Sequence, residues 1–367
     1  MSQYILVIIW PAVLYLISQM VNIYKTENVL GKEEVRVTTG FAIISILPLI
    51  YWTATRGIRF GDTYLYMKGF EEFPSTLKEI PAYMVNVEKD KGFRVFGIVL
   101  KTIIEDNVQL YFGIIAAIQV ISLAVVFRKY SSNYVMAIYI FIASTDYLSW
   151  MHNGIRQFIA VTLIFATTEW MIKKNYVPMI IIILLASTIH GSALMMIPVA
   201  FIVQGSPWNK KTMLAILAFV LAIVFVDRFT VILDDLLTDT QYTNVVSHWQ
   251  LIRDDGTNPI RVLIYSIPTL LSIVGYRHIK VANDPIINLA CNMGIISTML
   301  YCLSMVTSGI FIGRLPIYCS LYAMGILLPW ELENIFSKES SRLIKFLMVA
   351  SFLGFYCYQT HFIWGLI

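Results

Sequence analysis

Long runs of apolar residues alternate with short polar segments along almost the whole chain. Because a helix rises about 1.5 Å per residue, about twenty apolar residues are needed to cross the hydrocarbon core of a membrane. By this criterion we expect about twelve spans. They cover residues 3–23, 38–55, 108–127, 133–151, 156–172, 176–190, 191–204, 212–231, 259–276, 285–307, 309–330 and 345–365. The apolar run 176–204 is interpreted as two short helices joined by a tight turn at His190.

The composition supports the same class of protein. Hydrophobic residues make up 58% of the chain and charged residues only 14%, whereas a soluble domain carries roughly 25% charged residues. We therefore predict an all-α polytopic membrane protein with one transmembrane domain over residues 1–367. The net charge of +4 includes no long basic run, which argues against a nucleic-acid partner.

Basic residues in every second loop predict the orientation, because cytoplasmic loops carry an excess of Lys and Arg. These residues are Lys25, Lys32 and Arg36; Arg128 and Lys129; Lys173 and Lys174; Lys210 and Lys211; Arg277 and Lys280; and Lys338, Arg342 and Lys345. With twelve spans, both termini are expected outside. Two long segments, 56–107 and 232–258, then lie on the outer side.

The first outer segment, about residues 56–107, repeats apolar residues at helical spacing. They are Phe70, Phe73, Leu77 and Ile80, then Phe93, Phe96, Leu100, Ile103 and Ile104, with Arg94 and Lys101 expected on the opposite face. Amphipathic helices lying in the membrane interface are predicted here. The second segment, 232–258, carries several aspartates; we interpret it as a solvated acidic loop, with a divalent-cation site as the alternative.

Four short polar motifs occur at the predicted outer ends of spans. The first, residues 55–64, places Arg56, Arg59 and Asp62 three residues apart and also contains Gly57, Gly61 and Tyr64. Guanidinium groups at such spacing suit bidentate binding of phosphate oxygens. The glycines either permit close approach of a ligand or end the helix.

The other three motifs are spread along the chain. Asn153, Arg156 and Gln157 open the fifth span, where Asn153 is either a ligand contact or a helix cap. His190 follows small residues at a helix end, either as a proton acceptor or as a structural group. Arg314 follows Gly313 at the start of the eleventh span. Arginine at an outer boundary needs an anion, which is an internal carboxylate, a lipid phosphate or a substrate.

These motifs, in this order, resemble those of the EpsG/Wzy family of bacterial exopolysaccharide polymerases. The resemblance rests on residues 56–64, 153–157 with the apolar run that follows, 185–193 and 313–314. It implies a GT-C-like architecture and a glycosyltransferase at the outer face of the cytoplasmic membrane of a bacterium. The implied substrates are oligosaccharide repeat units on undecaprenyl pyrophosphate, with no nucleotide sugar and no metal. Implied partners are membrane lipid and other polysaccharide-assembly proteins, such as a flippase or a chain-length regulator.

The residue types agree with that chemistry, because negative charge grows on the pyrophosphate as its bond to the sugar breaks. We expect the four arginines of the motifs to hold pyrophosphate: Arg56, Arg59, Arg156 and Arg314. Asn153, Gln157 and Tyr64 are expected to contact substrate, and His190 is expected to be the general base, with Asp62 as the rival. The helices of residues 64–105 would form a lid or guide the polyprenyl tail.

Two other functions remain open from the sequence alone. A membrane O-acyltransferase acting on surface sugars also needs arginine and histidine within the membrane. A flippase or transporter of lipid-linked sugars should instead carry charged residues through mid-membrane positions. Because the intramembrane ionisable residues are predicted to gather at one end, the polymerase is favoured.

Overall fold

The computed structural model describes residues 3–58, 60–236 and 256–366. In chain order, the first helices and strands are α1 (Gln3–Met20), β1 (Tyr24–Val29), β2 (Lys32–Val37), α2 (Thr39–Ala54), α3 (Thr63–Glu71), η1 (Leu77–Glu79), α4 (Ile80–Met84), α5 (Lys91–Ile104), α6 (Val108–Tyr130), α7 (Tyr134–Ala143), α8 (Asp146–His152), α9 (Ile155–Ala166), α10 (Thr168–Ile172), α11 (Tyr176–Ile189) and η2 (Gly191–Met195). They are followed by α12 (Met196–Ile202), α13 (Lys210–Val224), α14 (Val226–Leu236), α15 (Pro259–Val274), α16 (Tyr276–Ala282), α17 (Pro285–Met305), η4 (Ile312–Arg314), α18 (Ile317–Tyr322), η5 (Ala323–Leu327), α19 (Leu328–Asn334), α20 (Lys338–Tyr358) and η6 (Gln359–Ile363). The mostly helical prediction is confirmed.

The chain divides into two compact units. The first comprises Met1–Ile197 together with Arg342–Ile367, and the second comprises Pro198–Ser341. Each unit is described by itself below. The single transmembrane domain expected over residues 1–367 stays a prediction.

Several helices are long and apolar enough to cross a membrane. In the described part of the chain, 5 helices meet this criterion, or up to 7 if each of two bent helix pairs is one span. The five are α1, α6, α17, the stretch Ile312–Asn334 and the stretch Lys338–Ile363. Shorter apolar helices of 10–17 residues occupy the remaining predicted spans, so the chain is a membrane protein but the count of twelve is not confirmed.

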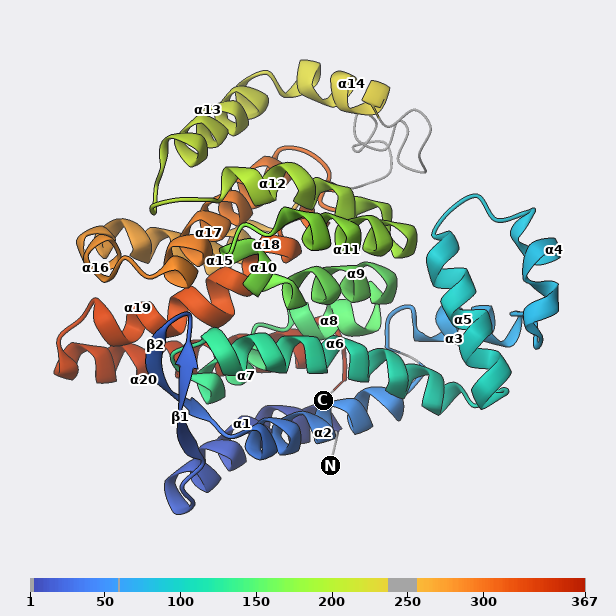
Figure 1. The fold of residues 1–367 in the computed structure, drawn as a ribbon, viewed down its shortest axis with the longest axis horizontal. Helices are drawn as coiled ribbons and strands as arrows, with labels where there is room; N and C mark the ends of the chain where they lie inside the picture. Colours follow the sequence, from blue (N-terminus) through green and yellow to red (C-terminus); the bar gives the residue numbers. More distant parts are fainter. Residues whose placement is uncertain (1–2, 59, 237–255, 367) are drawn as a thin grey trace. The chain divides into compact units, whose positions relative to one another are not determined.

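Helices of the first unit pack as successive layers. The contacts run from α2 to α6, from α6 to α9 and from α9 to α11 (Figure 1). Asn107 caps α6, where its side-chain oxygen accepts from the Leu110 N–H at 3.0 Å, and Thr38 caps α2 in the same way through Phe41. These caps satisfy N–H groups that a helix start leaves without an intrahelical partner.

A β-hairpin between α1 and α2 is the exception to the all-α prediction. β1 and β2 pair antiparallel from Tyr24 opposite Val37 to Val29 opposite Lys32. Leu30 and Gly31 form the turn, with φ of 52° and 85°, and positive φ at both positions is typical of a two-residue hairpin turn. The Asn28 side chain accepts from the Gly31 N–H at 3.0 Å. This hairpin was not predicted from the sequence, because only the basic residues of the segment were considered.

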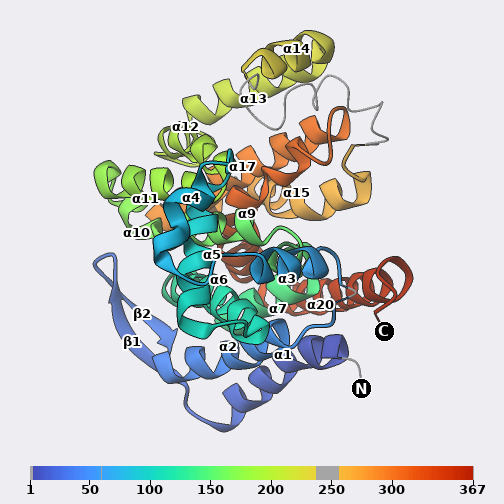
Figure 2. The same cartoon turned by 90° about the vertical axis from the view of Figure 1, so that its right-hand side faces the viewer.

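Helices in the segment 56–107 are confirmed as α3, α4 and α5. Phe70, Phe73 and Phe93 form a buried cluster with Tyr111 and Phe112 of α6, so α3 and α5 pack on the helix bundle. Figure 2 shows these two helices beside α6. Their interfacial location is not tested and stays a prediction.

Two details of this segment differ from the sequence prediction. Lys101 was expected on the exposed face of α5 but is buried, and its Nζ donates to the Glu71 carbonyl at 2.5 Å. Ile103, expected on the apolar face, is exposed. Lys101 is buried because a long side chain can cover apolar surface while its ammonium reaches the carbonyls that end α3.

Breaks within the predicted spans bring polar residues to helix ends. The predicted turn in 176–204 is confirmed, since α11 ends at Ile189 and His190 adopts an extended backbone before η2. The span predicted over 133–151 is broken at Thr145, which has a φ of 66°, and continues as α8. The first break places His190 beyond the end of a helix, and Asn153 likewise follows the end of α8.

The second unit is built around α17, which contacts α13, α15 and α18. Asn292 of α17 donates to the carbonyls of Val203 and Ser206 at 3.0 Å each. Of the predicted acidic loop 232–258, residues 237–255 lie outside the described residues. The unit also carries Arg314, at the end of η4.

Candidate active site

Arg56 lies just beyond α2 and is buried, with 7% of its surface exposed. Its Nε donates to the Thr63 Oγ1 at 3.0 Å, and its guanidinium carbon lies 3.9 Å from the centre of the Phe112 ring. The Nη2 atom has no hydrogen-bond partner. Among the described residues, none forms an ion pair with Arg56.

Burial lowers the pKa of the Arg56 guanidinium to about 10. Desolvation disfavours the charged form, but at this pKa the group is still protonated at neutral pH. A buried cation without a carboxylate is costly unless an anion joins it. The ring face of Phe112 compensates only part of that cost, about 2 kcal/mol when the pair is desolvated.

The first and second motifs meet at Gly61. Gly61 has a φ of +47°, and a Cβ atom there would overlap the side chain of Asn153. The Asn153 Oδ1 accepts from the Asp62 N–H at 3.2 Å, and its carbonyl accepts from the Tyr66 hydroxyl at 3.2 Å. Glycine is required here because only hydrogen at this position allows the approach. Two motifs distant in the chain therefore form one structure.

Arg156, in the first turn of α9, forms an ion pair with Asp90, the residue before α5. Burial raises the pKa of the Asp90 carboxyl, while the charges of Arg156, Arg94 and Lys89 oppose that rise. Arg94 lies in the first turn of α5, and its Nε is buried without a hydrogen-bond partner. Its guanidinium carbon lies 5.8 Å from the centre of the Phe73 ring.

A cavity of about 220 Å³ lies beside these groups. It is lined by Asp62, Leu65, Tyr66, Gly69, Phe73, Phe93, Arg94, Tyr111 and Arg156. Arg56, Arg94 and Arg156 all lie close enough to Tyr111 to interact with it electrostatically. Three guanidinium groups from α5, α9 and the end of α2 therefore gather at one end of the first unit.

The other predicted site residues have different surroundings. Gln157 is buried beside Arg156, whereas Tyr64 is 49% exposed and Tyr66 lines the cavity instead. His190 is buried, and its Nδ1 lies 2.7 Å from the Ser192 Oγ. The residue before it, Ile189, packs on the same buried cluster as Phe93.

Two predicted residues are not placed with this group. Arg59 lies outside the described residues. Arg314 belongs to the second unit, where Gly313 beside it packs so closely on Thr257 that a Cβ atom would overlap the Thr257 hydroxyl. The roles expected of both arginines stay predictions.

The family model of the EpsG family matches residues 39–364. The chain belongs to the EpsG family. No curated protein and no solved structure matches the chain. Membership in the EpsG family suggests an exopolysaccharide polymerase-like role of the glycosyltransferase type. The matched region contains all four motifs, while α1 and the hairpin precede it. The GT-C-like architecture stays a prediction.

Sequence reasoning missed four residues of this EpsG-family site: Asp90, Arg94, Tyr66 and Tyr111. Arg94 was interpreted as part of a solvated helix face. The available signal was its place one residue after Phe93, since a charge beside a buried aromatic residue at a helix start is brought close to the core. Nothing in the sequence near Asp90 indicates that it pairs with Arg156.

A second hollow of this EpsG-family chain has a different lining. A groove of about 540 Å³ lies between α1 and α20 and is lined by Ile5, Gly354, Cys357, Tyr358, His361 and Phe362. Its exposed lining is almost wholly apolar, and no Lys or Arg contributes to it. The smaller cavity beside Arg94 and Arg156 is therefore the one suited to an anionic ligand.

Proposed function

We propose that this chain is a polysaccharide polymerase that uses lipid pyrophosphate as the leaving group. It transfers a growing chain from undecaprenyl pyrophosphate to the terminal sugar of another lipid-linked repeat unit. The single observation that carries the proposal is the buried Arg56, which has no ion pair among the described residues and lies near Tyr111, as do Arg94 and Arg156, which line the cavity. Such a group of cations suits a dense anion such as pyrophosphate.

In the reaction, the bond between the sugar C1 and the pyrophosphate oxygen breaks, and its electrons stay on that oxygen. The acceptor hydroxyl oxygen forms the new bond to C1, and its proton passes to a general base. Charge therefore grows on the pyrophosphate in the transition state. Guanidinium groups already in place stabilise that charge, at about 3 kcal/mol for a typical single donor.

Roles for the individual residues follow from their surroundings. Arg56 and Arg156 hold the pyrophosphate, with Arg94 as a third cation, and the roles proposed for Arg59 and Arg314 rest on the sequence alone. Asn153, Gln157 and Tyr64 position substrate hydroxyl groups. His190 is the proposed general base because it is buried at a helix end, and Asp62 is the rival because it lines the cavity.

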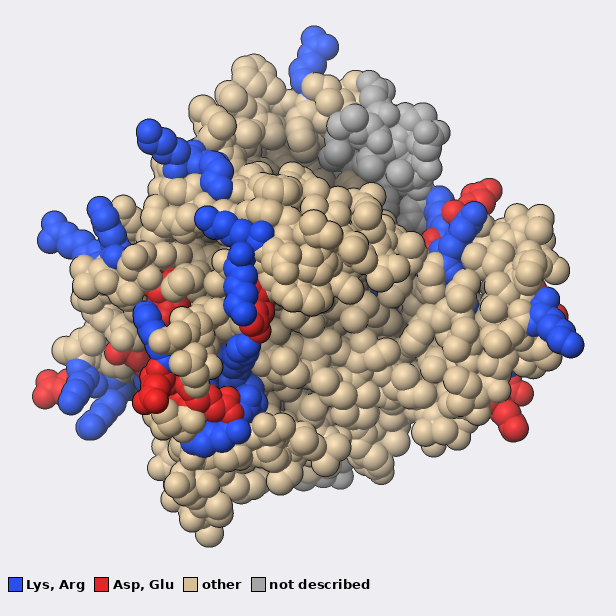
Figure 3. Space-filling model, in the orientation of Figure 1, with Lys and Arg blue, Asp and Glu red and all other residues tan. Residues whose placement is uncertain are grey.

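The proposal places this reaction at the outer face of a bacterial cytoplasmic membrane. This location is supported by the distribution of charged side chains over the surface of the first unit. In Figure 3, charged side chains gather over the hairpin and over α4 and α5, and the surface over the middle of α6, α9 and α11 carries none. An uncharged surface of this kind suits lipid, and on this face it separates the cavity end from the basic hairpin end.

Reconstitution tests the proposal directly. Purified protein in liposomes receives a synthetic repeat unit on a polyprenyl pyrophosphate, and products are resolved as a ladder. We expect a ladder with the intact protein and a loss of at least about 100-fold for Arg56→Ala and for Arg156→Ala. Arg128→Ala is the matched control, because Arg128 is a partly buried arginine paired with Glu27 at the hairpin end.

The outcomes separate the candidate functions. An unchanged ladder from the triple variant Arg56→Ala, Arg156→Ala and Arg314→Ala would overturn the proposal. Acetyl incorporation into the polysaccharide in place of chain growth would indicate the acyltransferase. For His190→Ala, full turnover would transfer the role of base to Asp62.

A further inference from the structure

Asp90 occupies an unusual position at the start of α5. Its backbone is left-handed, with φ 52° and ψ 40°, and its side chain makes no capping hydrogen bond to α5. The carboxylate instead pairs with Nη1 of Arg156 on α9, with 7% of the Asp90 side chain and 33% of the Arg156 side chain exposed. An aspartate before a helix normally caps it, so here the ion pair takes the place of the cap.

The charges around this pair are unbalanced. Arg156, Arg94 and Lys89 all act on the Asp90 carboxyl. Arg94 has a buried Nε without a partner and lines the same cavity as Arg156. Asp90 itself is not among the residues that line the cavity. The cavity lining thus contains two guanidinium groups and the Asp62 carboxylate, and Asp90 pairs with one of these guanidinium groups from outside the lining.

We propose that Asp90 is the internal counter-anion of Arg156, and that a phosphate group entering the cavity displaces the Asp90 carboxylate from this arginine. The inference rests on the proposed function, because it takes pyrophosphate as the ligand. It adds a residue that no motif singled out, and it assigns that residue a role in ligand exchange.

Competition at Arg156 has a physical basis. A diphosphate group carries more charge and more acceptor oxygens than a carboxylate, so it gains more from a planar guanidinium. The ion pair with Asp90 offsets part of the cost of partly burying the Arg156 guanidinium. After reaction the carboxylate returns to Arg156 and favours release of the lipid pyrophosphate product. Asp90 thereby lowers affinity and speeds exchange.

The local structure confines the movement to the turn before α5. Gly92 of α5 packs so closely on Thr188 of α11 that a Cβ atom would overlap it, which anchors the helix itself. Lys89 and Lys91, on either side of Asp90, are both exposed. Displacement of Asp90 would loosen Lys89 and Lys91, the first residue of α5, while the rest of α5 stays in place.

Binding of inorganic pyrophosphate to purified protein tests the competition. We expect Asp90→Asn to bind about tenfold more tightly than the intact protein, and a factor of ten corresponds to about 1.4 kcal/mol. Asparagine tolerates the left-handed backbone, so the variant should keep the turn. Asp106→Asn is the control, because Asp106 is an exposed carboxylate of the same segment that pairs with Lys101 at 3.1 Å; its affinity should be unchanged.

Limited proteolysis supplies the second readout. Trypsin should cut after Lys89 and Lys91 faster when pyrophosphate is bound, and equally fast with or without it in Asp90→Asn. Unchanged or weaker binding by Asp90→Asn would overturn the inference, as would protection of these lysines by pyrophosphate. If the intact protein and Asp90→Asn both fail to bind pyrophosphate, the proposed function fails as well, so the two failures are distinguishable.

Discussion

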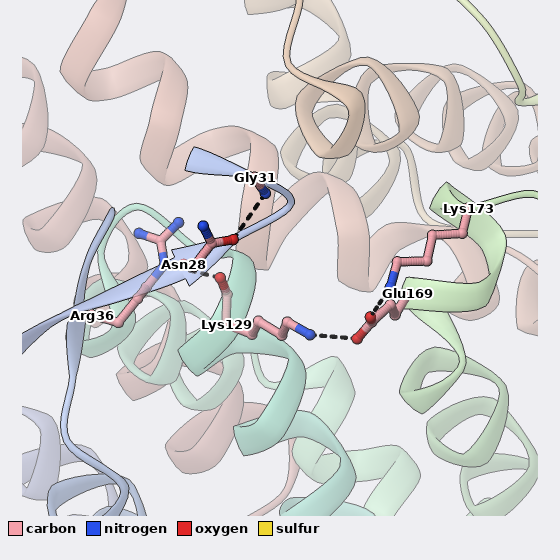
Figure 4. Close-up of polar contacts among 6 residues, drawn as sticks. All are labelled: Asn28, Gly31, Arg36, Lys129, Glu169 and Lys173. Atoms are coloured by element: carbon pink, nitrogen blue, oxygen red, sulfur yellow. Dashed lines mark hydrogen bonds and ion pairs between the residues drawn. The ribbon is translucent and has the colours of Figure 1, made fainter. Parts of the chain in front are cut away.

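The basic side chains at the two charged ends of the first unit have different partners. At the hairpin end, Arg128 pairs with Glu27, Arg36 with Glu34, and Lys129 and Lys173 both with Glu169. Figure 4 shows Lys129 between the hairpin and α10, with the Arg36 Nε donating to the Lys129 carbonyl at 2.9 Å. At the cavity end, Arg56 and Arg94 lie over aromatic rings, and neither forms an ion pair within the described part of the chain.

This difference teaches how to separate structural from functional cations in a membrane protein. The hairpin cations are all neutralised by carboxylates nearby, including the little-exposed Arg36 and Arg128, whose side chains are 10% and 16% exposed. The cavity cations are buried or partly buried, and among the described residues only Asp90 forms an ion pair with any of the three arginines. The proposed anion site rests on this group of cations at one end of the first unit.

The largest effect in this comparison is expected from two glycines with positive φ. Gly61→Ala forces a Cβ atom into Asn153, whereas Gly31→Ala at the hairpin turn meets no atom within 4 Å. We expect Gly61→Ala to lose about 2–4 kcal/mol of stability from strain and overpacking, and to lose polymerisation. Gly31→Ala should lose only about 1 kcal/mol, with activity retained. Thermal unfolding and the ladder assay measure both; equal losses would contradict the close contact at Gly61.

An intermediate effect is expected from the aromatic rings under the cations. Phe112→Leu keeps an apolar side chain but removes the ring face under Arg56, so we expect about tenfold slower polymerisation, corresponding to the 1–2 kcal/mol of a desolvated cation–π contact. The matched variant is Tyr130→Leu, because the centre of the Tyr130 ring lies 5.4 Å from the Lys129 Nζ at the hairpin end. Its activity should be unchanged. A tenfold loss in both variants would show that ring removal acts through packing.

The smallest expected effect is on the pH dependence of stability. The contributions of Glu27 and Asp90 should change with pH in opposite directions. Hydrogen bonds from Lys25 and then Arg128 lower the pKa of Glu27, whereas burial raises the pKa of Asp90. Glu27 therefore stabilises the fold above its unfolded pKa of about 4.3 and loses that effect as pH falls through its folded pKa. Asp90 contributes stability below about pH 3.9 and loses it as pH rises through its raised folded pKa.

The unfolding of two variants measures these slopes. From pH 4 to 7, the stability advantage of the intact protein should grow over Glu27→Gln and shrink over Asp90→Asn. We expect changes of a few tenths of a kcal/mol for the exposed Glu27 pair. If the stability difference changes with pH in the same direction for both variants, burial is not the main influence on the pKa of Asp90.

Much of the fold could be predicted from the sequence, because apolar periodicity and short loops are determined by residues that are neighbours along the chain. The membrane class, most helices, the break at His190 and the helices of segment 56–107 were predicted from such local signals. The arginine motifs were singled out because charge at the edge of an apolar span is costly. The hairpin and the burial of Lys101 were missed, because both depend on how side chains meet other helices.

Only the tertiary structure decided which arginine has a carboxylate and which does not. Asp90 and Arg156 are 66 residues apart, and the Asp62 N–H reaches Asn153 across 91 residues. No pattern along the chain specifies such pairs, because they arise from the way α5 and α9 pack around shared aromatic residues. The sequence determined that guanidinium groups would lie at this end of the first unit, and packing determined that no described carboxylate forms an ion pair with Arg56 or Arg94.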